Sequence, residues 1–233
     1  MPWPAPLEVP GVAYHVVHSG NGQPITFSCD ADYRVYRTLI ATYCSGYALD
    51  VWAYCLLPDR VHLVAVPGRI ESVRKAVAEA HRYYNRHINL VKNWRGKLWQ
   101  GRLALYPVAE DHLIPAARYV EMLPVHAGLS ESALDYSWSS ARAHCQGADD
   151  ELVRVKPLLD MAGDWRKLLQ VRLRKPDVDR LRLHEKTGRP LGSEAFVHEI
   201  ERALSRIIGQ QKPGRKRKGD QRKPTPVPLR IRA

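Results

Sequence analysis

The sequence predicts an α+β fold of the ferredoxin-like, split βαβ type, with an antiparallel sheet that carries helices on one face. Apolar residues repeat with the periods of strands and helices in the order strand, helix, strand, strand, helix, strand, helix. That order is typical of a split βαβ unit. The chain of 233 residues, 45% of them hydrophobic, can bury an ordinary core. We expect the second face of the sheet to stay available for a ligand.

The first strand and helix are predicted over residues 12–18 and 30–46. Val12, Tyr14 and Val16 alternate on one side of the strand, which ends at the turn-forming SGNGQP. His15 and His18 fall on opposite faces of this strand and are poor joint ligands. The helix begins at Asp30, a good N-cap residue, and ends at a glycine.

A hairpin and a second helix follow. The runs ALDVWAYCLL and VHLVAV flank the turn-forming PDR, and His62 shares a strand face with Arg60. The helix over 71–89 has an apolar stripe with helical spacing, made of Val73, Val77, Ala80, Tyr84 and Ile88.

A fourth strand is predicted at 103–108 and a third helix at 111–125, which Pro124 forces to end soon afterwards. We expect the ferredoxin-like domain to span residues 8–146. Shorter helical segments predict a C-terminal extension over 147–209, and the composition of 210–233 predicts a disordered basic tail.

The formal net charge of +12 is concentrated in that tail. Residues 212–233 hold Asp220 and these basic residues: Lys212, Arg215, Lys216, Arg217, Lys218, Arg222, Lys223, Arg230 and Arg232. Such a run is either a solvated tail or an arm that binds a polyanion through phosphate contacts.

The cysteines and the N-terminus indicate a cytoplasmic protein. The four cysteines include no C-x-x-C pair, which favours reduced thiols over a disulfide frame or a zinc site. The N-terminal residues lack the pattern of a secretory leader, and no apolar run is long enough to span a bilayer. We therefore expect no membrane partner.

Five segments in order resemble the single-tyrosine HUH transposases, in particular the REP-associated tyrosine transposase branch. They are GVAYHVVHSGNGQPI, CLLPDRVHLVAVP, WRGKLWQGR, ARYVEMLPVHAGL and SWSSARAH. The resemblance implies a protein that binds single-stranded or hairpin DNA and cleaves and rejoins a strand in DNA transposition. It implies Tyr119 as the nucleophile, which forms a 5′-phosphotyrosine link, and it raises the prospect of a homodimer.

The metal site of that family is altered in this chain. The resemblance places its ligands at Arg60, His62 and Leu123, but a guanidinium and an alkyl side chain have no lone pair to donate. Asp59 and Glu121 are the nearest carboxylates in sequence, and Asp59 points away from His62 on a strand. We expect a degraded site, with Mg²⁺ or Mn²⁺ as cofactor if this copy is active and none otherwise, and with Arg60 contacting a DNA phosphate directly.

Basic and aromatic side chains predict the DNA-binding surface. Stacking rings and phosphate-pairing charges alternate in WRGKLWQGR, as single-strand binding requires, although Trp99 could instead be anchored in the core. The candidates, including those on the 71–89 helix and in the tail, are Arg60, Trp94, Arg95, Lys97, Gln100, Arg102, Arg82, Arg86, Arg215, Lys216, Arg217 and Lys218.

Three functions remain open at this stage. The first is an active transposase, and the second is a catalytically impaired DNA-hairpin-binding protein derived from one. In that case Tyr119 is a half-buried helical tyrosine and His62 is a hydrogen-bonded core histidine. The third is an RNA-binding module of RRM layout, but Phe27 and Phe196 do not stand in the aromatic strand signature of that module.

Overall fold

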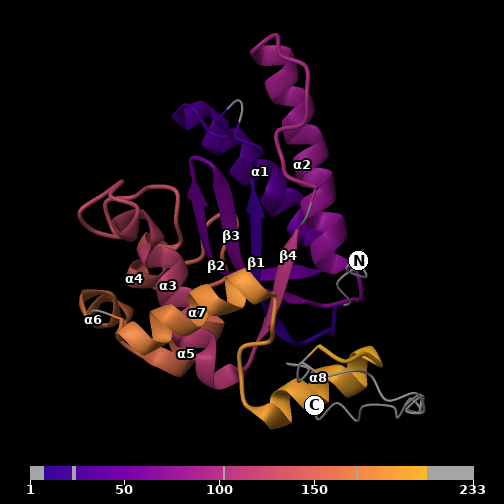
Figure 1. The fold of residues 1–233 in the computed structure, drawn as a ribbon. Helices are drawn as coiled ribbons and strands as arrows, with labels where there is room; N and C mark the ends of the chain where they lie inside the picture. The colour runs from indigo at the N-terminus through magenta and orange to yellow at the C-terminus, as the bar shows by residue number, and fades with distance from the viewer. Residues whose placement is uncertain (1–7, 23–24, 102, 172, 209–233) are drawn as a thin grey trace.

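The computed structural model describes residues 8–22, 25–101, 103–171 and 173–208, and it shows an α+β domain built on one four-stranded sheet (Figure 1). Every neighbouring pair of strands is antiparallel, in the order β2-β3-β1-β4. The α+β class and the antiparallel sheet predicted from the sequence are confirmed. The strands are β1 (Ala13–Ser19), β2 (Leu49–Leu57), β3 (Arg60–Pro67) and β4 (Ala104–Val108).

Two long helices cover one face of the sheet, α1 (Asp30–Gly46) and α2 (Ser72–Val91). The five apolar residues of the stripe predicted on α2 are all buried, as the helical period requires. Helix α1 ends at Gly46 as predicted, but its N-cap is Cys29, one residue before the predicted Asp30. The Ser28 N–H and hydroxyl donate to Asp32, at 2.8 and 2.9 Å.

The second face is also covered, contrary to the prediction of helices on one face only. Leu113, Ala117 and Val120 of α3 pack on Ala53 and Val64 of the sheet, and this cluster includes side chains of the C-terminal extension. The apolar ridge of α3 and the apolar side chains after residue 150 account for this, because each buries its area best against the remaining sheet face. The helices on this side are α3 (Leu113–His126), α5 (Lys156–Ala162), α6 (Trp165–Gln170) and α7 (Lys175–Thr187).

The free edge of β2 is closed by the chain that follows α3. Leu56 N donates to Trp138 O at 2.8 Å, Ser140 N to Tyr54 O at 3.0 Å and Arg154 N to Val51 O at 2.8 Å. These bonds satisfy backbone groups that an open edge strand would leave exposed. The remaining elements are the 3₁₀ turn η1 (Glu110–His112), α4 (Ala141–Gln146) and α8 (Glu194–Leu204).

The extension packs closely against the sheet domain. Trp165 and Leu158 are buried in the same cluster as α3, and Leu191 N donates to Pro107 O of β4 at 2.8 Å. The division at residue 147 stays a prediction, and the tail over 210–233 lies outside the described residues. Within the described part, no helix is both long enough and apolar enough for a membrane span.

Candidate functional site

Three side chains with metal-ligand chemistry meet on the sheet face that α7 crosses (Figure 1). They are His15 of β1, His62 of β3 and Glu185 of α7. His15 Nε2 and His62 Nδ1 lie 3.1 Å apart, and Glu185 Oε1 lies 3.9 Å from the first and 3.8 Å from the second. We call this group the His-His-Glu cluster.

The strand register brings the two histidines together. His62 is paired with Val17 and His15 with Val64, so the histidines are diagonal neighbours on adjacent strands and share a face. His18 points to the opposite side, as predicted, where its Nδ1 lies 2.9 Å from His81 Nδ1. Alternation along β1 therefore separates His15 from His18, and the pairing of β1 with β3 places His15 beside His62.

Both histidines of the cluster are held neutral. Burial lowers the pKa of His15 to about 3. Burial, together with the neighbouring His15 and Arg60, lowers the pKa of His62 well below its ordinary value. Neutral imidazole has a lone pair, so these rings are in the form that binds a metal ion.

Glu185 is the acidic member of the cluster. Burial raises its pKa to about 7, while the Tyr119 hydroxyl and the charges of Arg60 and Arg182 oppose that rise. Glu185 Oε1 and His62 Nε2 are buried and have no hydrogen-bond partner among the described residues. Unsatisfied buried polar atoms are costly, and an ion beside Glu185 Oε1 would satisfy that atom.

The predicted nucleophile lies against the same carboxylate. The Tyr119 hydroxyl of α3 donates to Glu185 Oε2 across 3.4 Å, and the Tyr119 ring lies edge-on to His15 with 6.3 Å between centroids. Burial and the charge of Glu185 raise the pKa of Tyr119 to about 12, against the opposing effect of Arg182. Tyr119 is only 3% exposed.

The other two ligand positions implied by the sequence resemblance do not contribute donors. Arg60 donates to both carboxylate oxygens of its neighbour Asp59, at 3.0 and 2.7 Å, and Leu123 packs in the apolar cluster under α3. The carboxylate of the cluster comes instead from Glu185, which the sequence analysis did not single out. A local motif could not have revealed it, because its approach depends on how α7 packs.

Glu121, the second carboxylate considered from the sequence, faces a different set of partners. It is fully buried and accepts hydrogen bonds from Ser140 Oγ at 2.5 Å and from Trp165 Nε1 at 2.7 Å. His144 Nδ1 lies 2.6 Å from Glu121 Oε1, the same oxygen that accepts from Ser140. Glu121 therefore ties α3 to α4 and α6, and it does not reach His62.

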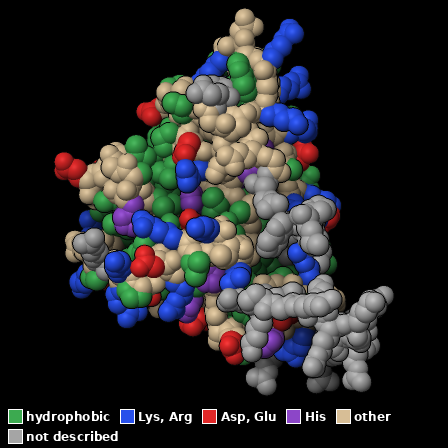
Figure 2. Space-filling view, in the orientation of Figure 1, with side chains coloured by type: hydrophobic (Ala, Val, Ile, Leu, Met, Phe, Trp, Pro, Cys, Tyr) green, Lys and Arg blue, Asp and Glu red, His purple; other side chains and the backbone are tan. Residues whose placement is uncertain are grey.

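The predicted DNA-binding residues lie mainly on α2 and on the loop between α2 and β4. Arg95, Lys97 and Gln100 are exposed, and Trp94 is partly buried. Figure 2 shows Lys and Arg side chains along the α2 part of the visible face and around α7. Arg102, Arg215, Lys216, Arg217 and Lys218 lie outside the described residues.

Some of these side chains have internal partners. Trp99 is buried and stacks on His81, with 3.7 Å between ring centroids, so it anchors the loop in the core. Arg82 donates to Glu79 at 2.6 Å and lies over the Tyr83 ring at 4.1 Å, but it remains exposed, as does Arg86. The exposed basic residues are therefore the ones positioned to contact a polyanion.

The chain matches no protein-family model and no curated protein sequence. It is similar to the solved structure of a REP-associated tyrosine transposase bound to a REP hairpin, at 14% identity and a TM-score of 0.50, over 65% of this chain and 90% of the other. It also matches a putative transposase from Deinococcus radiodurans at 18% identity and a TM-score of 0.36, over 47% of this chain and 88% of the other. The first likeness shows that the two proteins share a fold.

Proposed function

We propose that this protein is a transposase of the REP-associated tyrosine type, which binds single-stranded or hairpin DNA and cleaves and rejoins one strand through Tyr119. The fold likeness and the five sequence segments support this proposal. The observation that carries it is the position of Tyr119, whose hydroxyl bonds to a carboxylate that also faces two neutral histidines.

Tyr119 and Glu185 have the roles that strand cleavage needs. The Tyr119 oxygen attacks the phosphorus atom, a phosphorus–oxygen bond forms to Tyr119, and the bond to the 3′ oxygen breaks. Glu185 takes the phenolic proton through Oε2, the oxygen that already accepts from the Tyr119 hydroxyl at 3.4 Å. The 3′ oxygen leaves with a proton, and reversal of these steps rejoins the strand without another energy source.

The His-His-Glu cluster fits a divalent ion. His15 Nε2, His62 Nδ1 and Glu185 Oε1 offer two nitrogen donors and one oxygen donor, and these atoms lie 3.1 to 3.9 Å from one another. Mg²⁺ prefers oxygen ligands, whereas imidazole suits transition metals, so we propose Mn²⁺ in preference to Mg²⁺. A bound ion would polarise the scissile phosphate and stabilise the charge that develops on it.

Arg60 is proposed to hold a DNA phosphate at the edge of this site. Its side chain is 45% exposed, and the Asp59 carboxylate that it contacts is 55% exposed. Exposed ion pairs typically contribute about 0–1 kcal/mol, so a phosphate can compete for the guanidinium at small cost.

Hairpin binding without cleavage is the second candidate, and the burial of Tyr119 favours it. A phosphate can reach the hydroxyl only if the surrounding side chains or α7 move, because Tyr119 is 3% exposed. In this case the basic surface would retain its affinity for DNA, and the His-His-Glu cluster would only stabilise the fold.

The test is to incubate the protein with labelled hairpin oligonucleotides that carry single-stranded flanks, with Mn²⁺, with Mg²⁺ and with EDTA. We expect a covalent adduct on denaturing gels with the wild type and none with Tyr119→Phe. Tyr43→Phe, on α1, is the matched control and should retain the adduct. DNA binding without any adduct would favour the second candidate, and no binding would reject both.

An Arg60→His, Leu123→Asn variant separates two explanations of a negative result. These substitutions restore donor atoms at the positions that the resemblance assigns to the metal. An adduct formed by this variant alone would mean that His15 and Glu185 do not replace the missing ligands.

A further inference from the structure

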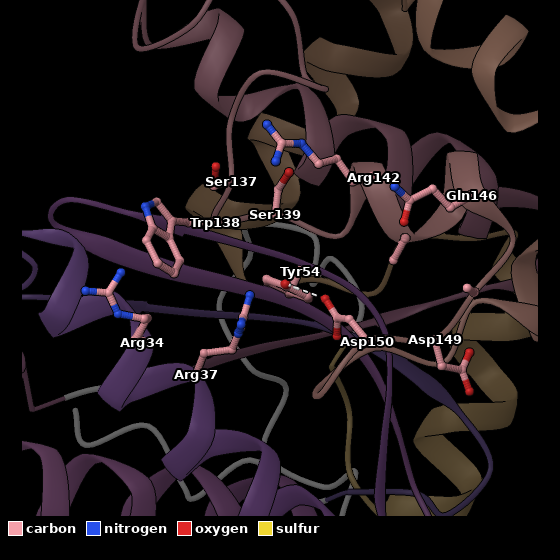
Figure 3. Close-up of a pocket in the computed structure, with 12 residues that line it drawn as sticks. Arg34, Arg37, Tyr54, Ser137, Trp138, Ser139, Arg142, Gln146, Asp149 and Asp150 are labelled. Atoms are coloured by element: carbon pink, nitrogen blue, oxygen red, sulfur yellow. Dashed lines mark hydrogen bonds between the residues drawn. The ribbon is translucent and has the colours of Figure 1, made fainter.

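A polar cavity lies between α1, the edge strand β2 and the chain at 137–150. It has a volume of about 320 Å³, which is the lower end of the range for small-molecule sites. Figure 3 shows Arg34 and Arg37 entering from α1, with Trp138 and Arg142 on the other side and Tyr54 at the floor.

This cavity is on the opposite side of the sheet from Tyr119. Tyr54 of β2 belongs to the cluster under α1 and α2, whereas its neighbour Cys55 belongs to the cluster under α3. Ligand bound in the cavity would therefore not contact the His-His-Glu cluster.

The cavity has more available positive charge than negative charge. Arg34 and Arg142 are exposed, and neither forms an ion pair within the described part of the chain. Arg142 Nε donates to Leu134 O at 2.6 Å, which fixes the side chain without neutralising it. Arg37 donates to Glu151 at 3.3 Å, and because their side chains are 29% and 38% exposed, this partly exposed pair contributes little to stability.

The two acidic residues of the lining already accept hydrogen bonds. Asp150 accepts from the Tyr54 hydroxyl at 2.6 Å and from the Leu152 and Val153 N–H groups, each at 2.7 Å. Asp149 accepts from Val155 N at 2.9 Å. These bonds hold both carboxylates against the loop, and the three arginines of the lining outnumber the two acidic residues.

Planar groups complete the site. The Trp138 ring stacks on Tyr33, with 4.8 Å between centroids and 10° between planes, and the Arg37 guanidinium lies 5.8 Å from its centroid. Tryptophan rings and guanidinium planes are the groups on which unpaired bases stack. Ser137 and Gln146 add a hydroxyl and an amide that can bond to a base edge.

We propose that this cavity binds one unstacked nucleotide of the single-stranded part of the DNA. Arg34 and Arg142 pair with its phosphate, and the base lies against Trp138 and Arg37. The inference rests on the proposed DNA-binding function and adds a second contact point, outside the cleavage site, that would hold the flank of a hairpin around the β2 edge.

The experiment compares the wild type with an Arg34→Gln, Arg142→Gln double variant, using a fluorescent dT20 oligonucleotide between 50 and 300 mM salt. Both arginines are surface residues without ion pairs, so the variant should fold, and circular dichroism checks this. We expect roughly tenfold weaker binding and a salt dependence reduced by about 0.7 in log–log slope, because both arginines pair with one phosphate and each single-strand phosphate contact contributes about 0.7. Arg69→Gln, an exposed arginine outside the cavity, should change neither.

A cross-linking experiment tests the proposed contact between the base and Trp138. Irradiation of dT20 containing 5-iodouracil, followed by peptide mapping, should yield a cross-linked peptide that includes Trp138. Affinity and slope equal to the wild type, with no cross-link on residues 137–150, would overturn the inference while leaving the proposed function in place. Absence of any dT20 or hairpin binding by the wild type would overturn both, and equal competition by an acidic peptide would assign the cavity to a protein partner instead.

Discussion

Glu185 should make the stability of the metal-free protein fall as the pH rises from about 4.5 to about 7. Its pKa in the folded protein is raised from an ordinary value of 4.5 to about 7, chiefly by burial. Below pH 4.5 the side chain is protonated in both folded and unfolded chains. Between these values the unfolded chain releases the proton and the folded chain retains it, so rising pH favours unfolding.

The magnitude follows from that rise in pKa. At about 1.4 kcal/mol per pH unit, the free energy of unfolding should decrease by about 3 kcal/mol across this window. The Glu185 side chain is 24% exposed, so solvent screens only part of the effect. Glu185→Gln has no carboxyl group to ionise, so this decrease in the free energy of unfolding should be absent from the variant.

The assay is urea unfolding at pH 4.5, 6 and 8 in EDTA, for the wild type, Glu185→Gln and the exposed control Glu199→Gln. All three proteins contain the same histidines. The difference in the free energy of unfolding between the wild type and Glu185→Gln therefore reports on the Glu185 carboxyl group alone. The free energy of unfolding of Glu185→Gln, measured relative to that of the wild type, should rise by about 3 kcal/mol between pH 4.5 and pH 8. A difference that does not change with pH would refute the reasoning.

Three further predictions concern the metal, the core and the tail. Mn²⁺ should bind more tightly at pH 8 than at pH 6 in calorimetric titrations, because Glu185 must release its proton to act as a ligand; equal affinities would argue against Glu185 as a ligand. Glu121→Ala should lower the free energy of unfolding by at least about 3 kcal/mol in urea titrations, because it leaves two buried donors, His144 Nδ1 and Trp165 Nε1, unpaired, whereas exposed Glu131→Ala should not. Deletion of residues 212–233 should weaken binding to all DNA sequences and flatten its salt dependence; unchanged affinity and slope would reject a DNA-binding tail.

The sheet and its first two helices could be predicted because their signals are local. Alternation along β1 and the hairpin turn at Pro58 fix which side chains share a face, and the spacing of Val73 to Ile88 fixes the buried side of α2. The same alternation correctly predicted that His15 and His18 lie on opposite faces of the sheet. It could not show that His15 lies beside His62, because that depends on which strands become neighbours.

The second sheet face and the third ligand could not be predicted for a related reason. The coverage of that face depends on how α3 and the extension pack, and their apolar residues alone do not specify a partner surface. Glu185 has no local motif, and its chemistry arises from burial next to Tyr119, His15 and His62. The resemblance supplied Tyr119 and His62, but proximity in sequence pointed to Asp59 and Glu121 as carboxylates, and both make other contacts.

The most direct test of the account is the Mn²⁺-dependent formation of a covalent DNA adduct by His15→Ala. We expect a strong adduct with the wild type, none with Tyr119→Phe, and at least a tenfold loss with His15→Ala despite unchanged DNA binding. His15 is outside the family's ligand positions, so this variant probes the cluster specific to this chain. Adduct formation by His15→Ala at the wild-type level, or none by the wild type, would contradict the assignment of a metal-assisted cleavage site to His15, His62 and Glu185.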